Sequence, residues 1–395
     1  MPVLPRALEI QGEIAAIRRD IHAHPELAFE ETRTSDIVAA KLQEWGIEVT
    51  RGLGKTGVVG TLRKGNSVRS IGLRADMDCL PMDEANDFGH RSQSPGRMHA
   101  CGHDGHTAML LGAAKILSET RNFEGAVHFI FQPAEEGGGG ARVMIEEGLF
   151  EKFPCDAVFA IHNKPGIPVG HIVTRGGPLL AAADRWDIRI TGRGGHAAHP
   201  HLTLDPMVVG ANVVLALQTI VSRNVDPIDS GVVTVGFFKA GSAYNVIPGD
   251  VHIGGTTRTT TPENRAMVKR RIDEICEGAA RMHGVQIEVT HMPGYPPTVN
   301  DVDQARFAIE VAAGVCGEHA VKDNARPSMG AEDFSYMLEK VPGAMVWLGN
   351  GGGDASGRGA VSLHNSRYDF NDMAIPFGAS FFVRTVERFL GDQKA

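Results

Sequence analysis

The sequence lacks any dense block of lysine and arginine. Its 39 basic residues are scattered among 47 acidic ones, and the formal net charge is −8. Neither a groove for nucleic acid nor a polybasic surface for anionic membranes is therefore expected. Residues 1–20 carry charges throughout and lack the uninterrupted apolar core of a signal peptide. No stretch of the sequence approaches the length of a membrane span, so a membrane is not expected as a partner.

Cysteine is scarce, and its number is odd. The five cysteines lie far apart, at positions 79, 101, 155, 276 and 316. Such spacing does not resemble a disulfide framework, and it favours a reducing compartment, which we expect to be the cytoplasm. In that setting a conspicuous cysteine is a metal ligand, a nucleophile or a plain core residue.

The length of 395 residues is more than one compact core usually holds, so two domains are expected. In the first part of the chain, apolar strands alternate with helices. Strands are expected at 58–63, 70–78, 126–132 and 157–163, and helices at 7–22, 33–45 and 106–119. This alternation predicts an α/β fold with an open, mostly parallel sheet flanked by helices. Reactive residues in such sheets follow the carboxyl ends of strands.

The middle of the chain, at 184–298, has a different pattern. Strands and helices are expected there in the order β-α-β-β-α-β, at 186–191, 205–221, 232–238, 251–259, 262–283 and 285–290. This order predicts an inserted ferredoxin-like domain. Thr261 is the expected N-cap of its second helix and Gly284 the expected C-terminal stop. The rest, 1–183 plus 299–395, is predicted to form one discontinuous domain that carries the chemistry.

Residues 98–106 read MHACGHDGH and hold three histidines, a cysteine and an aspartate. Thiolate and imidazole are preferred ligands of zinc and similar ions. Cys101 and His103 lie two positions apart, so in an extended segment their side chains point the same way. The glycine between them lets the backbone pass close to a metal. A buried cysteine beside helix-capping residues is the alternative, but the density of ligand types favours a metal site.

Residues 132–136 read QPAEE and follow an apolar strand. Two carboxylates at the end of a buried strand are costly unless cations or hydrogen bonds compensate them. One of the two glutamates, Glu135 or Glu136, can ligate a metal while its neighbour points into the cleft as a proton shuttle. A solvated acidic loop is the alternative.

His162 ends another apolar strand, and His364 follows a glycine-rich loop. With Cys101, His103 and Glu136 they complete a set large enough for two metals with open positions. Structural zinc sites use closed sets of four ligands at short spacings. Ligands scattered over some 260 positions therefore favour a catalytic site. Asp78, at the end of the strand expected at 70–78, is a candidate outer carboxylate that orients a ligand; a strand-end turn or N-cap is the alternative.

Motifs along the whole chain resemble the hippurate hydrolase branch of the aminoacylase and carboxypeptidase metallohydrolases. They include RRDIHAHPELAFEE, RADMDCLP, MHACGHDGHTAMLLGAA, FIFQPAEEGGGGA, GRGGHAAHPH, GAEDFSYM and LHNSRYDFND. The resemblance implies a catalytic domain like that of the di-zinc exopeptidases, with an inserted lid that dimerises. It implies Cys101, His103, Glu136, His162 and His364 as metal ligands and Glu135 as general base. Asp76 stands where related carboxypeptidases have a histidine, as is usual for this branch.

The resemblance also assigns roles in the inserted domain. It implies that His196 reaches an active site, often that of the partner subunit, where it would stabilise an oxyanion. Asn245 and Arg258 match positions that hold the substrate carboxylate. The implied cofactors are two divalent metal ions, with zinc first and manganese, nickel or cobalt as alternatives. The implied assembly is a homodimer or homotetramer that forms through the lid.

The expected function is hydrolysis of the amide bond of a small-molecule N-acyl-amino acid, such as N-benzoylglycine or an N-acetyl-amino acid. A metallo-exopeptidase, acting as carboxypeptidase or dipeptidase on the same site, is the first alternative. A nucleotide-binding enzyme is disfavoured, because no GxxxxGK[ST] or GxGxxG motif follows a strand. A non-catalytic metal-binding protein of the same fold is disfavoured by the presence of Glu135 beside the full ligand set.

Overall fold

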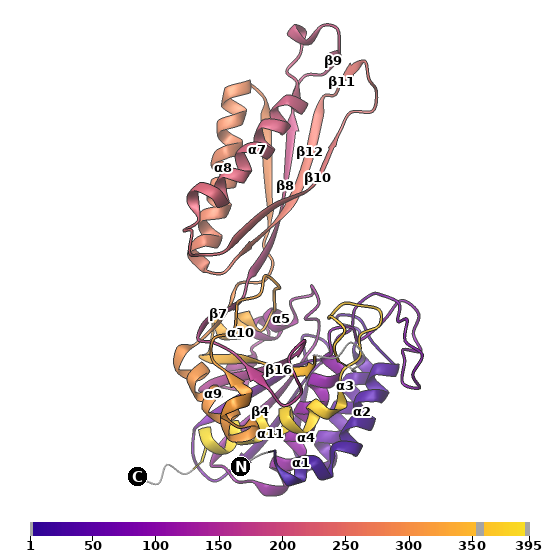
Figure 1. Ribbon diagram of the computed structural model, residues 1–395, viewed down its shortest axis with the longest axis vertical. Helices are drawn as coiled ribbons and strands as arrows, with labels where there is room; N and C mark the ends of the chain where they lie inside the picture. The colour runs from indigo at the N-terminus through magenta and orange to yellow at the C-terminus, as the bar shows by residue number, and fades with distance from the viewer. Residues whose placement is uncertain (1–2, 353–358, 392–395) are drawn as a thin grey trace. The chain divides into compact units, whose positions relative to one another are not determined.

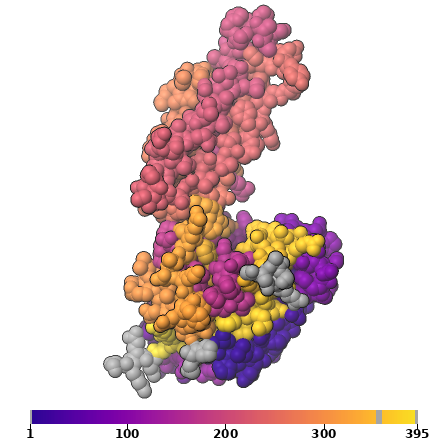
Figure 2. Space-filling model, in the orientation of Figure 1, coloured from indigo at the N-terminus to yellow at the C-terminus, as the bar shows by residue number. Residues whose placement is uncertain are grey.

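A computed structural model describes residues 3–352 and 359–391. The chain forms two compact units: unit 1 comprises Met1–Leu179, Val299–Arg326 and Asp333–Ala395, and unit 2 comprises Leu180–Thr298 and Pro327–Glu332. Each unit is a dense body by itself (Figure 2). The second unit begins four residues before the predicted boundary at 184. It also includes the short segment 327–332, which the sequence did not predict.

Unit 1 is built on an eight-stranded sheet with the strand order β1-β2-β4-β3-β5-β16-β6-β15. Its strands are β1 (Glu48–Leu53), β2 (Gly57–Lys64), β3 (Ser70–Asp76), β4 (Gly125–Gln132), β5 (Ala157–Pro165), β6 (Ile172–Val173), β15 (Val321–Lys322) and β16 (Gly343–Gly351). The four central strands, β4, β3, β5 and β16, run parallel to one another. Strands β3, β4 and β16 are buried along their whole length, as expected of parallel strands covered on both faces. The predicted open, mostly parallel α/β sheet is confirmed.

Helices cover this sheet (Figure 1). They are α1 (Pro5–Glu9), α2 (Gln11–Ala23), α3 (Thr32–Glu44), α4 (His103–Thr120), α5 (Gly140–Glu146), α6 (Leu149–Lys152), α9 (Val302–Cys316), α10 (Ser335–Leu338) and α11 (Ile375–Phe389). Helix α4 is buried along most of its length, and α2 and α11 pack against it. The helix predicted at 7–22 is divided into α1 and α2 at Ile10.

Unit 2 has a four-stranded antiparallel sheet in the order β10-β12-β8-β13. Its elements are β8 (Ala182–Thr191), α7 (Pro206–Asn224), β10 (Gly231–Ala240), β12 (Asp250–Thr259), α8 (Pro262–His283) and β13 (Gln286–Met292). Order and pairing match the predicted ferredoxin-like arrangement. Thr261 caps α8 by accepting a hydrogen bond from the Asn264 amide, and Gly284 ends the helix in the left-handed conformation.

Short elements complete the two units. Strands β9 (Gly195–His196) and β11 (Val246–Ile247) pair with each other in unit 2, and β7 (Gly177–Leu180) pairs with β14 (Thr298–Asn300) where the chain passes between units. Single turns of 3-10 helix lie at Pro200–Leu202, Glu318–Ala320 and Asp372–Ala374.

Helix α7 corrects one expectation from the sequence. Its 19 residues and mean hydropathy of 1.3 give it the length and composition of a membrane span. Length and composition alone are weak evidence for a membrane span, because core helices of globular domains share them. In unit 2, Val209, Val213, Leu217 and Ile220 of α7 are buried in a core that includes Trp186 and Ile188 of β8. The helix therefore has a packed apolar face within its own domain.

Candidate metal centre

Gly102 shapes the turn between Cys101 and α4. Its φ of +91° lies in the left-handed region, which favours glycine. A Cβ atom at this position would lie 2.3 Å from Asn163 Nδ2 and 2.5 Å from Tyr368 Oη, so a side chain has no room. His103 is the first residue of α4. The expectation of an extended Cys101–His103 segment is therefore wrong, because the left-handed glycine starts the helix directly.

The structure brings the five predicted ligands together. Ligand atoms of Cys101, His103 and His162 lie within 4.8 Å of one another, and so do those of Cys101, Glu136 and His364. Cys101 Sγ is 3.5 Å from His162 Nε2, and His364 Nε2 is 3.2 Å from Glu136 Oε1. Cys101 belongs to both trios, and a thiolate has lone pairs enough to bridge two cations. The arrangement thus offers two adjoining metal positions.

Two buried atoms at this spot lack a hydrogen-bond partner among the described residues: His103 Nε2 and Glu136 Oε1. The contact of Glu136 Oε1 with His364 has the distance of an ion pair without hydrogen-bond geometry. Orphaned buried acceptors are costly, and a cation would satisfy both. The residues present therefore fit a metal centre.

The electrostatics of the site also favour a cation. Interaction with the Cys101 side chain and with the Glu136 carboxylate raises the pKa of His364 to about 10, so these two groups attract positive charge. Burial and the neighbouring His106 hold the pKa of His162 well below its usual range, so its ring is neutral. A neutral imidazole is the form that binds a metal.

Asp78 orients both sides of the site. His103 Nδ1 lies 3.0 Å from the Asp78 carbonyl oxygen and 3.1 Å from its Oδ1, while the Glu136 amide donates to Asp78 Oδ2 at 2.9 Å. Because β3 ends at Asp76 and not at 78, Asp78 lies in the following loop, where it can reach both partners.

Asp76 is engaged by its neighbours. Its Oδ1 is 2.6 Å from His106 Nδ1, and its Oδ2 accepts from Arg74 Nη1 at 2.8 Å. Arg74 in turn donates to Asp333 Oδ1 at 3.0 Å. The Asp76 Oδ2 atom also lies 3.7 Å from His103 Nε2, so the carboxylate faces a predicted ligand directly.

Sequence reasoning missed a second chain of buried groups behind the ligands. His106 Nε2 accepts from the Asn163 amide at 2.9 Å, Asn163 Nδ2 donates to the Cys101 carbonyl at 2.6 Å, and Tyr368 Oη donates to Asn163 Oδ1 at 2.7 Å. His106 and Tyr368 stand in the quoted motifs, but nothing local in the sequence shows that both contact Asn163.

Glu135 lies beside the centre. It is 6 % exposed, and its ligand oxygen lies within 4.8 Å of ligand atoms of His103 and Glu136. The amide of Asp333 donates to Glu135 Oε1 at 3.4 Å. A carboxylate in this place can take and return a proton next to the metal positions.

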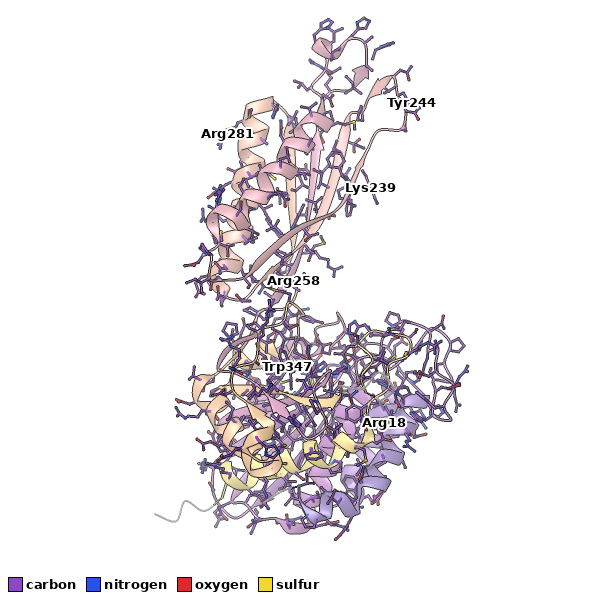
Figure 3. The ribbon with its side chains drawn as sticks, viewed as in Figure 1. Arg18, Lys239, Tyr244, Arg258, Arg281 and Trp347 are labelled. Atoms are coloured by element: carbon purple, nitrogen blue, oxygen red, sulfur yellow. The ribbon has the colours of Figure 1, made fainter. Side chains whose placement is uncertain are left out.

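The remaining predicted residues belong to unit 2. His196 lies in β9, which pairs with β11, and Asn245 directly precedes β11. Arg258 lies near the far end of β12, where its Nη1 donates to the Thr257 carbonyl at 2.9 Å. Within unit 2, Arg258 and the Asn245 neighbour Tyr244 lie at opposite ends of the sheet (Figure 3). Arg258 lies eight positions along β12 from Asp250, roughly 26 Å of strand.

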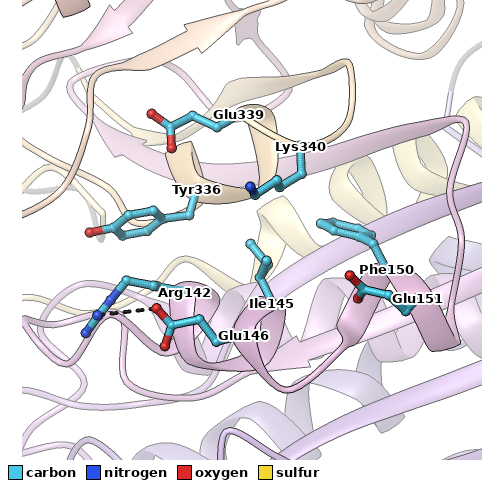
Figure 4. Close-up of a pocket in the computed structure, with 8 residues that line it drawn as sticks. All are labelled: Arg142, Ile145, Glu146, Phe150, Glu151, Tyr336, Glu339 and Lys340. Carbon is cyan, nitrogen blue, oxygen red and sulfur yellow. Dashed lines mark hydrogen bonds and ion pairs between the residues drawn. The ribbon is translucent and has the colours of Figure 1, made fainter.

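A groove of about 660 Å³ opens elsewhere on unit 1, between α5, α6 and α10 (Figure 4). Its lining residues are Arg142, Ile145, Glu146, Phe150, Glu151, Tyr336, Glu339 and Lys340. Arg142 Nη1 is 3.5 Å from Glu146 Oε1. The lining includes none of the predicted ligands, so the groove is separate from the metal centre.

The chain is similar to known hydrolases over nearly its whole length. The profile of peptidase family M20/M25/M40 matches residues 72–388. Hippurate hydrolase of Campylobacter jejuni is 43% identical over 390 residues, which cover 99% of this chain and 100% of the relative. N-acetyl-L-cysteine deacetylase of Bacillus subtilis is 38% identical over 387 residues, which cover 96% and 89%.

A solved structure agrees with these sequence relatives. The YXEP protein of Bacillus subtilis, described as a dinuclear metal binding peptidase from the M20 family, superposes with a TM-score of 0.85 at 33% identity. The match covers 97% of this chain and 99% of that one. The relatives confirm the predicted resemblance and the prediction of an amide-bond hydrolase.

Proposed function

The chain belongs to peptidase family M20/M25/M40, and on that premise we propose that it is a metal-dependent amidohydrolase of N-acyl-amino acids. Its substrates would include N-benzoylglycine and N-acetyl-amino acids, and its products a carboxylic acid and a free amino acid. The observation that carries the proposal is the meeting of Cys101, His103, Glu136, His162 and His364 at one spot beside Glu135. Similarity to hippurate hydrolase and to a deacetylase supports this substrate class.

The proposed cofactors are two divalent ions, zinc first, with manganese, nickel or cobalt as alternatives. Cys101 would be shared, His103 and His162 would complete one position, and Glu136 and His364 the other. A thiolate favours the softer ions, while availability decides in cells. Metals bound there supply Lewis acidity and lower the pKa of water. We place the reaction in the cytoplasm, since the structure describes all five cysteines and each is free.

Glu135 is the proposed general base. It takes the proton of the attacking water and then delivers it to the departing amine nitrogen, so one carboxylate serves both steps. Its low exposure keeps bulk solvent from competing for that proton. The Asp333 amide, which donates to its Oε1, fixes the carboxylate's direction.

The proposed substrate contacts in unit 2 require a second subunit. One small carboxylate cannot touch both Asn245 and Arg258 of a single unit, because roughly 26 Å of β12 separates their ends of the sheet. His196 pairs with Val246 and so lies at the same end of unit 2 as Asn245. We therefore propose that His196 and Asn245 act in the site of the partner subunit, in a homodimer or homotetramer.

Exposed apolar side chains support this assembly. On α7, Val208 and Leu215 are 55% and 69% exposed, although the other face of the helix is packed. Apolar surface of this kind is typical of contacts between subunits. Light scattering of the purified protein tests the assembly: a monomer at micromolar concentration would contradict it.

The metallo-exopeptidase is the alternative on the same site. The substrates of the two activities differ in the group on the carbonyl side of the scissile bond. It is a simple acyl group in an N-acyl-amino acid and an amino-terminal residue in an unblocked dipeptide. Metal-loaded protein is incubated with N-benzoylglycine, N-acetyl-amino acids and unblocked dipeptides, with and without chelator, and free amino acid is measured. We expect the N-acyl substrates to be cleaved faster; faster cleavage of dipeptides would establish the alternative.

The base assignment has its own test. Glu135→Gln is expected to lower kcat by ~10²-fold or more with metal content unchanged. Glu119→Gln is the matched control, because Glu119 lies sixteen residues along α4 from His103, roughly 24 Å of helix. If Glu135→Gln turns over like wild type, the base is another residue.

A further inference from the structure

The turn that carries Glu135 and Glu136 is strained. Ala134, directly before them, has a φ of +55°, which residues with a Cβ rarely adopt. It is fully buried. Such a conformation persists only when surrounding contacts impose it. The direction of both glutamates therefore depends on whatever holds this turn.

Three carboxylates from distant segments hold backbone amides of this turn and of the first residues of α5, which follows it. Asp78 accepts from Glu136, Asp333 Oδ2 accepts from Ala141 at 2.9 Å, and Glu31 Oε1 accepts from Ala134 at 2.8 Å. Asp78 also faces His103, and Asp333 also faces Glu135 through its amide. Glu31 meets the turn at its strained residue.

Glu31 ties this turn to two other segments. Its Oε1 also accepts from the Phe29 amide at 3.1 Å, and its Oε2 accepts from Thr56 Oγ1 at 2.6 Å. Phe29 has a φ of +64° itself, and Thr56 lies in the tight turn between β1 and β2. A single carboxylate thus fixes two strained backbones with respect to each other.

The surroundings of Glu31 show that this contact is specific. The side chain is fully buried, and burial raises the pKa of its carboxyl to about 7. Burying an ionisable group is costly, so a group with only a packing role would be apolar. The turn is also tightly packed, because a Cβ on Gly138 would lie 2.7 Å from Ala134 Cβ and 3.1 Å from the Phe29 ring.

We propose that Glu31 is a positioning residue for the hydrolysis: through the Ala134 amide it sets the direction of Glu135 and Glu136. The proposal rests on the proposed function for its catalytic readout. Catalytic groups displaced by about 1 Å can lose ~10²-fold in rate, so a loosened turn would reach both the base and a metal ligand.

The test compares Glu31→Ala, Glu31→Asp and Glu31→Gln with Asp156→Ala. Asp156 is the matched control because its Oδ2 accepts from the Ser70 amide at 2.8 Å, at the start of β3. Ser70 lies six residues from Asp76, roughly 20 Å from the centre. Each variant is titrated with Co²⁺, whose visible spectrum reports the ligand geometry, and then assayed with N-benzoylglycine for kcat and KM.

Glu31→Ala is expected to lower kcat at least ~10-fold with KM nearly unchanged, and to alter the Co²⁺ spectrum. Glu31→Asp, one methylene shorter, should behave similarly because its carboxylate cannot reach Ala134. Glu31→Gln should recover most of the activity, since its amide oxygen accepts from Ala134 and the Thr56 hydroxyl can reverse to accept from its NH₂ group. Asp156→Ala should match wild type.

A wild-type kcat and spectrum in a folded Glu31→Ala protein would overturn the proposal. If that variant does not fold, Glu31→Asp decides in the same way. A loss in Asp156→Ala as large as that in Glu31→Ala would also overturn it. If wild type binds Co²⁺ but cleaves no N-acyl-amino acid, the proposed function fails, and the altered or unaltered spectrum of the Glu31 variants still decides the positioning role.

Discussion

The Asp78 carboxylate lies 3.1 Å from Nδ1 of His103, on the side of the imidazole ring opposite Nε2, which is buried and makes no hydrogen bond to the described residues. A hydrogen-bonded Nδ1 fixes the ring and leaves the Nε2 lone pair for a metal. Asp78 would therefore orient the proposed centre from behind one of its ligands.

Replacing Asp78 should weaken metal binding. Asp78→Ala is expected to lower zinc affinity or activity by ~10- to 100-fold, since both the ring of His103 and the Glu136 amide lose their partner. A competition titration with a chromophoric chelator measures the affinity. Asp83→Ala is the control, because Asp83 also accepts a backbone amide, that of Gly96 at 2.7 Å, on the exposed surface. Equal affinities in the two variants would contradict the orienting role.

Removing the metals should abolish hydrolysis and lower the melting temperature. A metal that binds the folded chain at a hundred times its Kd contributes about 2.7 kcal/mol. Protein dialysed against chelator is expected to melt at a lower temperature and to recover on addition of zinc or manganese. Melting curves that are superimposable with and without metal would argue against a site at Cys101 and His103.

Arg18 should contribute more to the free energy of unfolding than the adjacent Arg19. It is buried against three carboxylates, with distances of 3.2 Å to Asp104, 2.9 Å to Asp369 and 2.8 Å to Asp372. Arg18→Met leaves these charges uncompensated and should cost about 3–5 kcal/mol. Arg19→Met is the control: Arg19 also pairs with Asp372 but is 46% exposed, so less than about 1 kcal/mol is expected. Urea unfolding measures both, and similar midpoints would refute the difference.

His128 should make the fold sensitive to acid. Burial lowers the pKa of this β4 side chain to about 4, below its usual value of 6.5. The unfolded chain therefore binds a proton first as the pH falls, and the stability present above pH 6.5 is lost toward pH 4. The loss should reach up to ~3 kcal/mol. In urea unfolding between pH 7 and 4, His128→Leu should lack this part of the pH dependence. If the stability of the variant falls with pH in parallel with that of wild type, His128 is not responsible.

Local patterns in the sequence determined much of this protein. The apolar runs of β3, β4 and β5 and the capped helix α8 were predicted closely, because burial periodicity and capping act over a few residues. The Cys101–His103 and Glu135–Glu136 pairs were recognisable for the same reason, as several ligand types fall within a short segment. The enzyme class followed from motifs spread over the whole chain.

Tertiary structure alone decided how the centre is held together. Arg74 meets Asp333 across 259 positions, and Glu31 meets Ala134 across 103, and no local pattern marks such partners. It also placed His103 in a helix instead of an extended segment, because Gly102 adopts a left-handed conformation where Asn163 and Tyr368 leave no room for a side chain. The sequence names groups with the right chemistry, whereas the burial and hydrogen bonds that orient them arise only when distant segments fold against one another.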